Sequence, residues 1–439
     1  MRPQPYLAES WSVQNQGKKW VFKIRPGQKD HSGQEITPQR LATCFEEYRS
    51  GTPRSILMSS FRSLKSIEAK GSELVFELTQ PDPYLATNLT LFRYFTTGDP
   101  SKPCREPKAQ DTIITSGEYR LSRFQFEDLN PEHSLELIPT DPARRTLKIS
   151  WALDENTKAL QLIRGEVDVA TNSLSLSKTR WVEKKYAHRF KVIERSNGVN
   201  VSYLLFNFKN PHLKKPEVRK AIALAIDRDE YVRHKLFGFG NPAGSLLSPA
   251  LEESAPQSFE YNPKKAEELL EQAGYPRGSD GVRLRLRYKT TSVRDGFEIA
   301  LSFQNSLRRI GIELTLDVVE PAVYFASVRK GAFDLCSSRW IGVSDASILQ
   351  RTLMTGNPDN RGGYSSPETD ALLQEATLQP DPVQRRAILA KIQAKVAQDL
   401  PYLPLWYWNP SVILRKDLTG LESSELSLSG SLAPLSRLR

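Results

Sequence analysis

The amino-acid sequence predicts an α/β protein with more than one domain. The chain has 439 residues, whereas a single hydrophobic core usually stops growing at about 250–300 residues. Apolar and basic residues alternate from Val282 to Tyr288, which is the pattern of a half-buried strand. A helical stretch over residues 295–309 and a second alternating run, Ile312 to Leu316, follow it. A strand, a helix and a strand in this order predict a βαβ unit with a parallel strand pair.

Further helices are predicted where a capping residue is followed by proline at the first helical position. These starts are Thr37-Pro38, Asn262-Pro263, Ser366-Pro367 and Asp381-Pro382. The first helix is expected to carry an apolar stripe that includes Leu41 and Cys44, and to end at Gly51. Strands are predicted for residues 20–25 and 73–79, where apolar residues recur at every second position.

Composition and charge exclude several classes of protein. Hydrophobic residues make up 39% of the chain, which rules out wholesale disorder, and no run approaches the ~20 apolar residues that span a bilayer. The net charge is +10, and much of it lies between Lys178 and Arg195, where Trp181, Tyr186 and Phe190 are interleaved. No recognition helix, zinc finger or RNA-binding motif accompanies this stretch. We therefore interpret it as an amphipathic element with its aromatics in a core, and expect no nucleic-acid partner.

Catalytic and metal-binding motifs are missing from the sequence. The five histidines are scattered, with no HExxH and no close Cys/His set for zinc. The glycine-rich run from Gly238 to Gly244 has the wrong spacing for a dinucleotide loop and follows a helical pattern. The sequence therefore predicts no enzyme, no cofactor and no bound metal, although an enzyme built on a binding scaffold stays open because catalytic groups need not be adjacent.

The three cysteines are too few for a disulfide framework. Cys44 lies on an apolar helical stripe, so we expect it in a core, and Cys336 is expected in a buried strand. Cys104 lies in a loop with proline and lysine, and is predicted to be the exposed thiol.

Five segments, in order along the whole chain, resemble one family, the periplasmic solute-binding proteins of oligopeptide, dipeptide and nickel ABC transporters. The most diagnostic is YLLFN at Tyr203–Asn207 with PEVRKAIALAIDR at Pro216–Arg228. It is similar to the family pattern YLGFN followed by PFxDVRVRQAxxxAIDR. The other four are LAESW with WVFKIRPG, TSGEYRL, ALQLIRGEVDVA, and YSSPETDALL with LPYLPL; they lie at Leu7–Gly27, Thr115–Leu121, Ala159–Ala170 and Tyr364–Leu405.

The resemblance implies a fold and a division of the chain. The fold would be α/β and periplasmic-binding-protein-like, with two lobes joined by a hinge and an extra N-terminal domain packed on lobe I. Lobe I would comprise residues 119–196 and 409–439, lobe II residues 197–408, and the extra domain residues 1–118. Family members begin with a signal peptide, a strand and a helix ahead of the LAESW-like segment, so we expect the sequence to be truncated at this end.

The function implied by the resemblance is the substrate-binding component of an ABC importer. It would capture a peptide or other small polar solute between the lobes, act as a monomer in the periplasm, and deliver the solute to an ABC permease in the inner membrane. The alternative is a cytoplasmic ligand-sensing domain of a transcriptional regulator, since some regulators carry the same binding fold.

Candidate ligand-binding residues are carried over by position. In peptide binders of this family, an Asp three residues after a cleft Trp pairs with the peptide ammonium. Here the Trp is Trp340, but the third residue is Val343, and Asp345 could substitute only if the loop shifts. A sugar, an opine-like compound or a blocked peptide is therefore as good a candidate as a free-amine peptide. The remaining candidates are aromatic rings to stack on the ligand and polar groups to anchor it, namely Trp406, Tyr407, Trp408, Tyr203, Asn207 and, for a carboxylate, Arg361.

Overall fold

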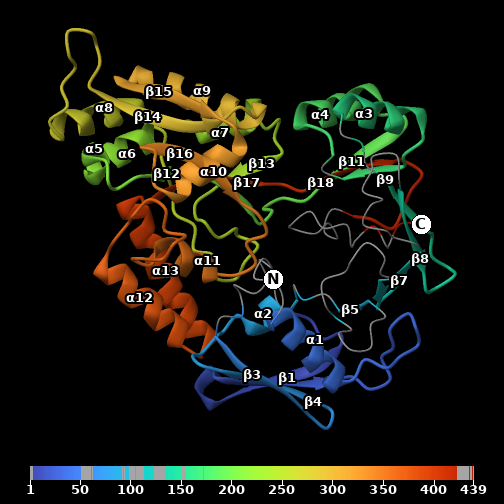
Figure 1. Cartoon of the computed structure of the whole chain (residues 1–439). Helices are drawn as coiled ribbons and strands as arrows, with labels where there is room; N and C mark the ends of the chain where they lie inside the picture. Colours follow the sequence, from blue (N-terminus) through green and yellow to red (C-terminus); the bar gives the residue numbers. More distant parts are fainter. Residues whose placement is uncertain are drawn as a thin grey trace.

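The structure is a computed structural model of the 439-residue chain. It describes residues 3–50, 61, 63–90, 92, 94–97, 104, 113–122, 134–150, 152, 154–171, 173–422, 435 and 438. Figure 1 shows two α/β lobes side by side, with a unit built from the N-terminal residues below them. The α/β class and the two-lobed architecture are confirmed.

The larger lobe, lobe II, is built on a six-stranded sheet in the order β13-β17-β12-β16-β14-β15. The predicted βαβ unit is confirmed, because β14 and β15 pair in parallel from Leu284↔Ile312 to Thr291↔Val319 and the helix α9 connects them. The strands are β12 (Asn200–Phe206), β13 (Gly240–Pro242), β14 (Leu284–Thr291), β15 (Ile312–Val319), β16 (Leu335–Trp340) and β17 (Tyr402–Trp408).

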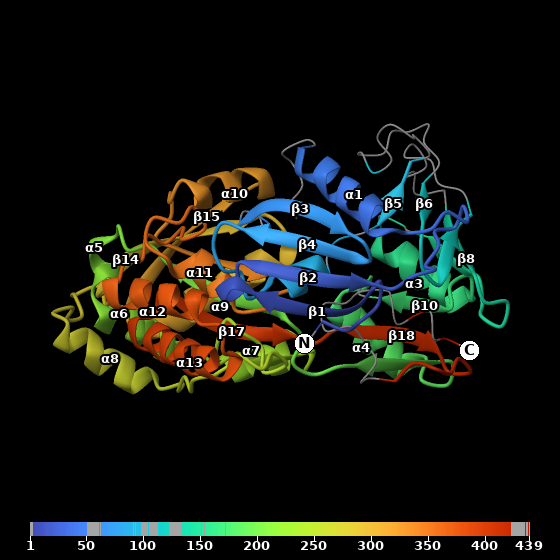
Figure 2. The same cartoon turned by 90° about the horizontal axis from the view of Figure 1, so that it is seen from below.

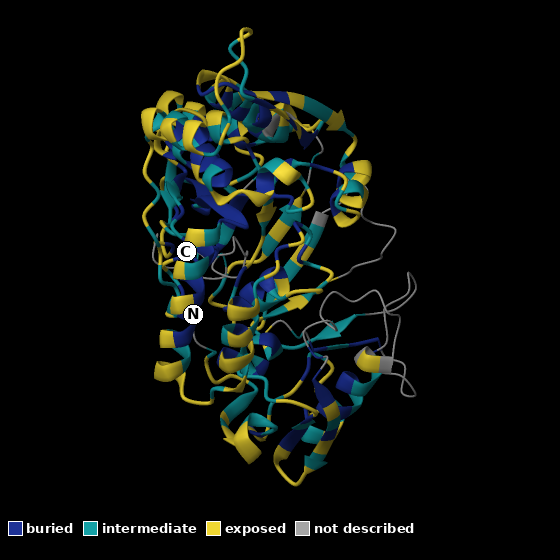
Figure 3. Ribbon diagram, turned by 90° about the vertical axis from the view of Figure 1, so that its left-hand side faces the viewer, coloured by how far each residue is buried: buried dark blue, intermediate teal, exposed yellow. Residues whose placement is uncertain are grey.

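Two separate hydrophobic clusters cover the two faces of this sheet. The first involves the helices α5 (Pro211–Lys214), α6 (Pro216–Ala225), α7 (Arg228–His234), α8 (Pro263–Gln272) and α9 (Arg294–Arg309). The second involves α10 (Pro321–Arg329), α11 (Ser347–Leu353), α12 (Pro367–Leu378) and α13 (Pro382–Asp399). Figure 3 shows buried residues between these layers and exposed residues on the outer turns of the helices.

Lobe I holds two small sheets. One has the order β10-β18-β11 and is covered by α3 and α4, and the other has the order β7-β8-β9. The elements are β7 (Tyr119–Leu121), β8 (Ser134–Pro139), β9 (Leu147–Ser150), α3 (Glu155–Arg164), β10 (Val169–Thr171), α4 (Leu176–Lys185), β11 (Phe190–Glu194) and β18 (Ser411–Arg415).

The basic stretch 178–195 forms α4 and β11. Phe190 is buried, as predicted, but Trp181 is 40% exposed. The prediction that its aromatics all face a core is therefore wrong for Trp181.

Two chain segments connect the lobes. Residues 195–199 lead from β11 into β12, and Asn409 and Pro410 lead from β17 into β18. The segments touch at Gly198, where a Cβ atom would lie 2.0 Å from the carbonyl oxygen of Trp408. Only glycine fits this contact, so the crossing is tightly packed.

The N-terminal unit has a four-stranded antiparallel sheet in the order β1-β2-β4-β3, which faces the viewer in Figure 2. The helix α1 packs on this sheet over a core that includes Phe45 and Phe76. The elements are β1 (Ala8–Gln14), a 3₁₀ turn (Asn15–Gly17), β2 (Lys19–Ile24), α1 (Pro38–Ser50), β3 (Leu64–Lys70), β4 (Glu73–Leu78), α2 (Leu85–Leu89), β5 (Phe95–Thr96) and β6 (Ile114–Thr115).

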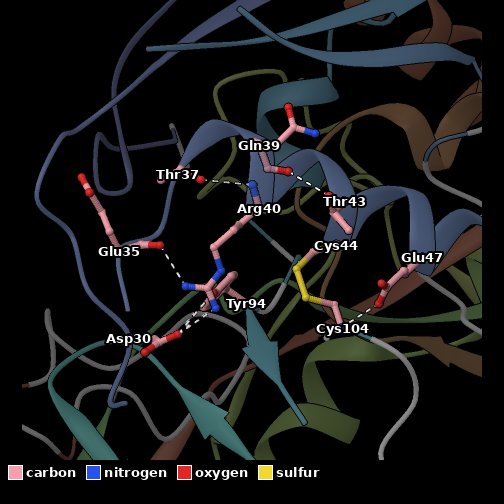
Figure 4. Close-up of a disulfide and its surroundings, with 10 residues drawn as sticks. All are labelled: Asp30, Glu35, Thr37, Gln39, Arg40, Thr43, Cys44, Glu47, Tyr94 and Cys104. Carbon is pink, nitrogen blue, oxygen red and sulfur yellow. Dashed lines mark hydrogen bonds and ion pairs between the residues drawn. A yellow bond between two sulfur atoms is a disulfide. The ribbon is translucent and has the colours of Figure 1, made fainter. Parts of the chain in front are cut away.

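A disulfide bond joins Cys44 on α1 to Cys104, with their Cα atoms 5.0 Å apart. Cys104 is only 2% exposed, and its backbone N–H donates to Glu47 at 2.7 Å (Figure 4). The prediction of an exposed free thiol at Cys104 is therefore wrong, because spacing along the chain does not reveal that the loop returns to α1. The predictions for Cys44 and Cys336 are confirmed, since both are buried.

The four predicted helix starts are confirmed, because α1, α8, α12 and α13 each begin at the expected proline. In all four the predicted capping side chain accepts a backbone hydrogen bond, as Thr37 does from Arg40 at 3.3 Å and Asp381 does from Gln384. The predicted end of α1 at Gly51 lies outside the described residues. In the described part of the chain, none of the helices combines the length and apolar character that crossing a bilayer requires.

Candidate functional site

Strand register divides the predicted ligand-binding residues between the two faces of the lobe II sheet. Val201 lies opposite both Trp340 and Tyr407, and Tyr203 lies opposite Ser338. Directly paired residues share a face and neighbours along a strand alternate. Tyr203, Trp340 and Tyr407 therefore point to the face covered by α10–α13, and Trp406 and Trp408 to the opposite face.

Trp340 ends β16 and forms an aromatic platform. Its indole stacks on the ring of Tyr203, with the ring centroids 5.7 Å apart and the planes at 26°. Tyr203 is buried and meets Tyr402 edge to face at 5.2 Å. Burial raises the pKa of the Tyr203 phenol, so this side chain stays neutral. Its ring supports the Trp340 indole by stacking on it. Trp340 itself is half-buried, and Ile341 beside it is 70% exposed.

Two arginines flank the indole of Trp340. Their guanidinium carbons lie 5.9 Å (Arg351) and 5.8 Å (Arg361) from the ring centroid. Both arginines pair with Asp359, Arg351 at 3.1 Å and Arg361 at 3.6 Å. This places Arg361 beside Trp340, although 20 residues separate them in the sequence.

The loop after Trp340 is folded back on lobe II. The backbone N–H of Gly342 donates to the Asn200 side chain at 2.7 Å, and that of Val343 donates to the Val199 carbonyl at 3.2 Å. Val343 is 6% exposed and belongs to the hydrophobic cluster beneath α10–α13. This position is therefore part of a core.

Asp345 is 5% exposed, and it accepts hydrogen bonds from the backbone N–H of Ser347 at 2.9 Å and from the Ser344 hydroxyl at 3.1 Å. These bonds hold the start of α11. The shift of the loop that would let Asp345 replace the carboxylate missing at Val343 is not seen.

Acidic groups of lobe II meet the N-terminal unit near Asp345. Tyr84, at the start of α2, is hydrogen-bonded to Glu253, and Arg385 on α13 lies 5.9 Å from the Tyr84 ring centroid. Burial raises the pKa of Glu253, and the charge of Asp345 raises it further. Burial likewise raises the pKa of Asp82, which also experiences the charge of Asp345. Glu253 and Asp82 therefore hold their protons to a higher pH than usual.

Three predicted residues are fully inside lobe II. Trp406 is 0% exposed and stacks on Tyr231 with centroids 4.4 Å apart. The hydroxyl of Tyr407 donates to the carbonyl oxygen of Ser245 at 2.8 Å, and Asn207 donates to the carbonyls of Gly331 and Phe333. In this structure these side chains pack in the core or hold loops in place, and their direct contact with a ligand stays a prediction.

Trp408 and Arg339 lie on the opposite face of the sheet from Trp340. The Arg339 guanidinium carbon is 4.7 Å from the Trp408 ring centroid, and Nε1 of Trp408 donates to the Ser202 hydroxyl at 2.8 Å. Trp408 is half-buried beside the crossing between the lobes. The structure therefore brings Trp340, Tyr203 and Arg361 together, and leaves Trp408 apart from them.

Sequence reasoning missed Arg351, Tyr84, Glu253 and Arg385. Arg351 lies on α11, the helix that follows Trp340, and no pattern of basic residues in the sequence singles it out. Tyr84 and Glu253 come from separate units, so only the packing of those units brings them together.

Two α/β lobes joined by two crossing segments define a bilobal binding protein. The model for the middle part of the bacterial extracellular solute-binding proteins, family 5, matches residues 2–360, and the chain belongs to this family.

Curated relatives come from several bacteria. The chain is 25% identical over 461 aligned positions to the probable deoxycholate-binding periplasmic protein YgiS of Escherichia coli, covering 95% of this chain and 82% of the relative. It is 26% identical to the oligopeptide-binding protein AppA of Bacillus subtilis, covering 94% of this chain and 80% of the relative. It is 22% identical to the nickel-binding periplasmic protein of Escherichia coli, covering 94% of this chain and 83% of the relative.

Solved structures show the same fold. The crystal structure of NikA from Brucella suis with Fe(III)-EDTA matches with a TM-score of 0.84 at 20% identity, over 99% of this chain and 90% of that chain. A putative peptide-binding protein AppA from Clostridium difficile matches with a TM-score of 0.85 at 18% identity, over 99% of this chain and 91% of that chain.

Proposed function

We propose that this chain is the solute-binding component of an ABC importer, which closes its lobes on a small solute and delivers the solute to a membrane permease. The observation that carries the proposal is family membership across residues 2–360 in a chain with a two-lobed fold. A hinged pair of lobes couples ligand binding to a closed shape, and a partner in the membrane can recognise that shape. The chain would act as a monomer and without catalysis.

The arrangement of the sheets supports the proposed division of the chain. The sheets β1–β4 and β5–β6 lie within residues 1–118, the proposed extra domain. The sheets β7–β9 and β10-β18-β11 lie within 119–196 and 409–439, the proposed lobe I. The six-stranded sheet lies within residues 197–408, the proposed lobe II.

We propose Trp340 and Arg361 as direct ligand contacts, because they lie together, whereas Trp408 is on the other face of the sheet. Each has a half-buried side chain on lobe II, so part of its surface is accessible. Tyr203 and Asp345 are proposed as supports that hold Trp340 and the loop after it in place.

A periplasmic location is proposed in preference to a cytoplasmic ligand-sensing regulator. The Cys44–Cys104 disulfide supports it, because disulfides persist in oxidising compartments and are rare in the cytosol. Two relatives in Escherichia coli are also named as periplasmic proteins.

Fractionation of the native producer tests the location and the function together. We expect the full-length protein in the periplasmic fraction, with Cys44 and Cys104 resistant to thiol-alkylating reagents until a reductant is added. A wholly cytosolic protein with two alkylatable thiols would contradict the proposal and favour the regulator.

Native mass spectrometry of the purified chain tests solute binding directly. We expect a bound small molecule that is lost when the protein is denatured and dialysed. Failure to retain any solute, together with no thermal stabilisation by any member of a broad solute panel, would contradict the binding function.

A further inference from the structure

Two nitrogen donors on neighbouring side chains of lobe II are buried without an acceptor. They are Nε1 of Trp340 and Nε of Arg361, and neither has a hydrogen-bond partner in the described part of the chain. The guanidinium carbon of Arg361 lies 5.8 Å from the Trp340 ring centroid, so the two side chains are neighbours. A buried donor without an acceptor costs about 1–3 kcal/mol. An acceptor supplied from outside the chain would remove this cost.

The charge around these donors is positive. Asp359 is the carboxylate that pairs with both Arg351, at 3.1 Å, and Arg361, at 3.6 Å. One negative charge is thus shared by two guanidinium groups, both of which lie within 6 Å of the Trp340 ring centroid. The longer distance on the Arg361 side leaves this arginine the more weakly neutralised of the two.

The position of the group is suited to a bound solute. Trp340 is at the carboxyl end of β16, and the exposed Ile341 follows it. Tyr84 of the N-terminal unit packs against the same hydrophobic cluster as Trp340. Tyr84 and Trp340 therefore border the same apolar core of lobe II.

We propose that Trp340, Arg351 and Arg361 form a subsite for a carboxylate group of the transported solute. The inference rests on the proposed solute-binding function and specifies its substrate class. A guanidinium group presents a planar fork of N–H donors that matches a carboxylate, and an indole N–H adds a third donor in a fixed direction. Tyr203 stacks on the indole and the two guanidinium groups lie within 6 Å of its ring centroid, so this ring positions both arginines at the subsite.

The subsite selects for acidic solutes. A positively charged group would meet two guanidinium groups and two N–H donors, with Asp359 already engaged by both arginines. The carboxylate subsite also explains how a ligand is held in a chain where Val343 stands at the position of the ammonium-binding residue.

The test compares matched solutes that differ only in this charge. The probes are N-acetylated amino acids and N-acetylated dipeptides, each as the free acid and as the C-terminal amide, titrated into the full chain by calorimetry. We expect at least one acid to bind ten times more tightly than its amide, or better. Equal affinity within each pair would overturn the inference.

Variants of the chain identify the residues. Arg361→Gln is expected to weaken acid binding about ten- to a hundredfold while the amide is unaffected, since a hydrogen bond to a charged group is worth about 1.5–3 kcal/mol. Arg361→Lys keeps the charge but loses the fork, and should restore part of the affinity. Trp340→Phe keeps the stack on Tyr203 and loses the N–H, so it should also weaken acid binding selectively.

The matched control is Arg386→Gln, which removes an arginine on α13 that pairs with Glu252 away from Trp340. It should leave acid binding unchanged. Unaltered acid binding in Arg361→Gln, with a melting temperature like that of the parent chain, would overturn the inference.

Native mass spectrometry separates this inference from the proposed function. A co-purified solute with no acidic group would overturn the carboxylate subsite and leave the solute-binding function standing. No bound solute, and no binding of any probe, would count against the solute-binding function and the subsite together.

Discussion

The guanidinium group of Arg180 in lobe I lies over the ring of Phe239 in lobe II, 3.8 Å from the ring centroid. The same side chain donates to the carbonyl oxygen of Phe237 at 3.0 Å and pairs with Glu183 and Glu194. Glu194 in turn accepts from the Asn409 side chain at 2.7 Å, next to the crossing. Arg180 therefore joins the two lobes at a point outside the connecting segments.

Arg180→Ala is expected to let the lobes move apart. It removes a cation–π contact worth about 0.5–2 kcal/mol and the hydrogen bond to Phe237. Small-angle X-ray scattering should show a larger radius of gyration without ligand. Arg164→Ala, which removes a mostly exposed arginine of α3, is the control. Identical scattering of the Arg180→Ala variant and the parent chain would contradict the role of Arg180.

Acid is expected to strengthen the contact between the N-terminal unit and lobe II. The pKa values of Glu253 and Asp82 are both raised above the ordinary values of 4.5 and 3.8. At pH values just above 4.5 and 3.8, the folded protein therefore binds more protons than the unfolded chain. Protonation stabilises the fold there, and this stabilisation is lost as the pH rises through the raised pKa values. Glu253→Gln should raise the melting temperature at pH 7 and flatten its dependence on pH.

The charged and titratable groups that face Glu253 are Asp345, Tyr84 and Arg385. Glu252→Gln, which changes an exposed neighbour, is the control for the pH experiment. If the melting temperatures of Glu253→Gln and Glu252→Gln depend on pH in the same way, protonation of Glu253 does not cause the pH dependence of this contact.

Loss of the disulfide should destabilise the N-terminal unit. The bond closes a loop with a sequence separation of 60, and the chain-entropy model assigns about 4 kcal/mol to a loop of this length. Cys44→Ser should lower the midpoint of denaturant unfolding for this unit. Dithiothreitol should lower the midpoint of the parent chain to that of the variant and leave the variant unchanged. An equal effect of dithiothreitol on both proteins would contradict this assignment.

Trp406 is expected to matter for stability and not for ligand selectivity. Its ring is fully buried against Tyr231, so Trp406→Ala should cost about 3–5 kcal/mol of unfolding free energy, measured in urea. Trp406→Phe should recover much of the lost unfolding free energy and bind solute with the affinity of the parent chain. A fully stable Trp406→Ala variant with altered solute binding would show that the ring contacts the ligand.

Local patterns in the sequence predicted the elements better than the site. The alternation from Val282 and the capping residue before Pro382 depend on near neighbours only, so both were predicted correctly. The resemblance to a family supplied the two-lobed architecture, which periodicity could not have provided.

The site depended on contacts between distant segments. Alternation along β17 separates Trp406 from Tyr407, but the sequence does not say which face of the sheet the ligand meets. The contact of Tyr84 with Glu253 and the bond of Cys44 to Cys104 join segments far apart in the chain. Such pairs have no local pattern, so a single sequence could not reveal them.

The close contact of Gly198 with the Trp408 carbonyl has a mechanical consequence. The segment that contains Gly198 is bent, with Asn197 in the left-handed region at a φ of 58°, and it passes directly against the backbone of the second connection. A Cβ atom at position 198 would also lie 2.8 Å from the ring of Pro410 in that second connection. Any side chain at position 198 would therefore push the two connections apart and loosen the joint between the lobes.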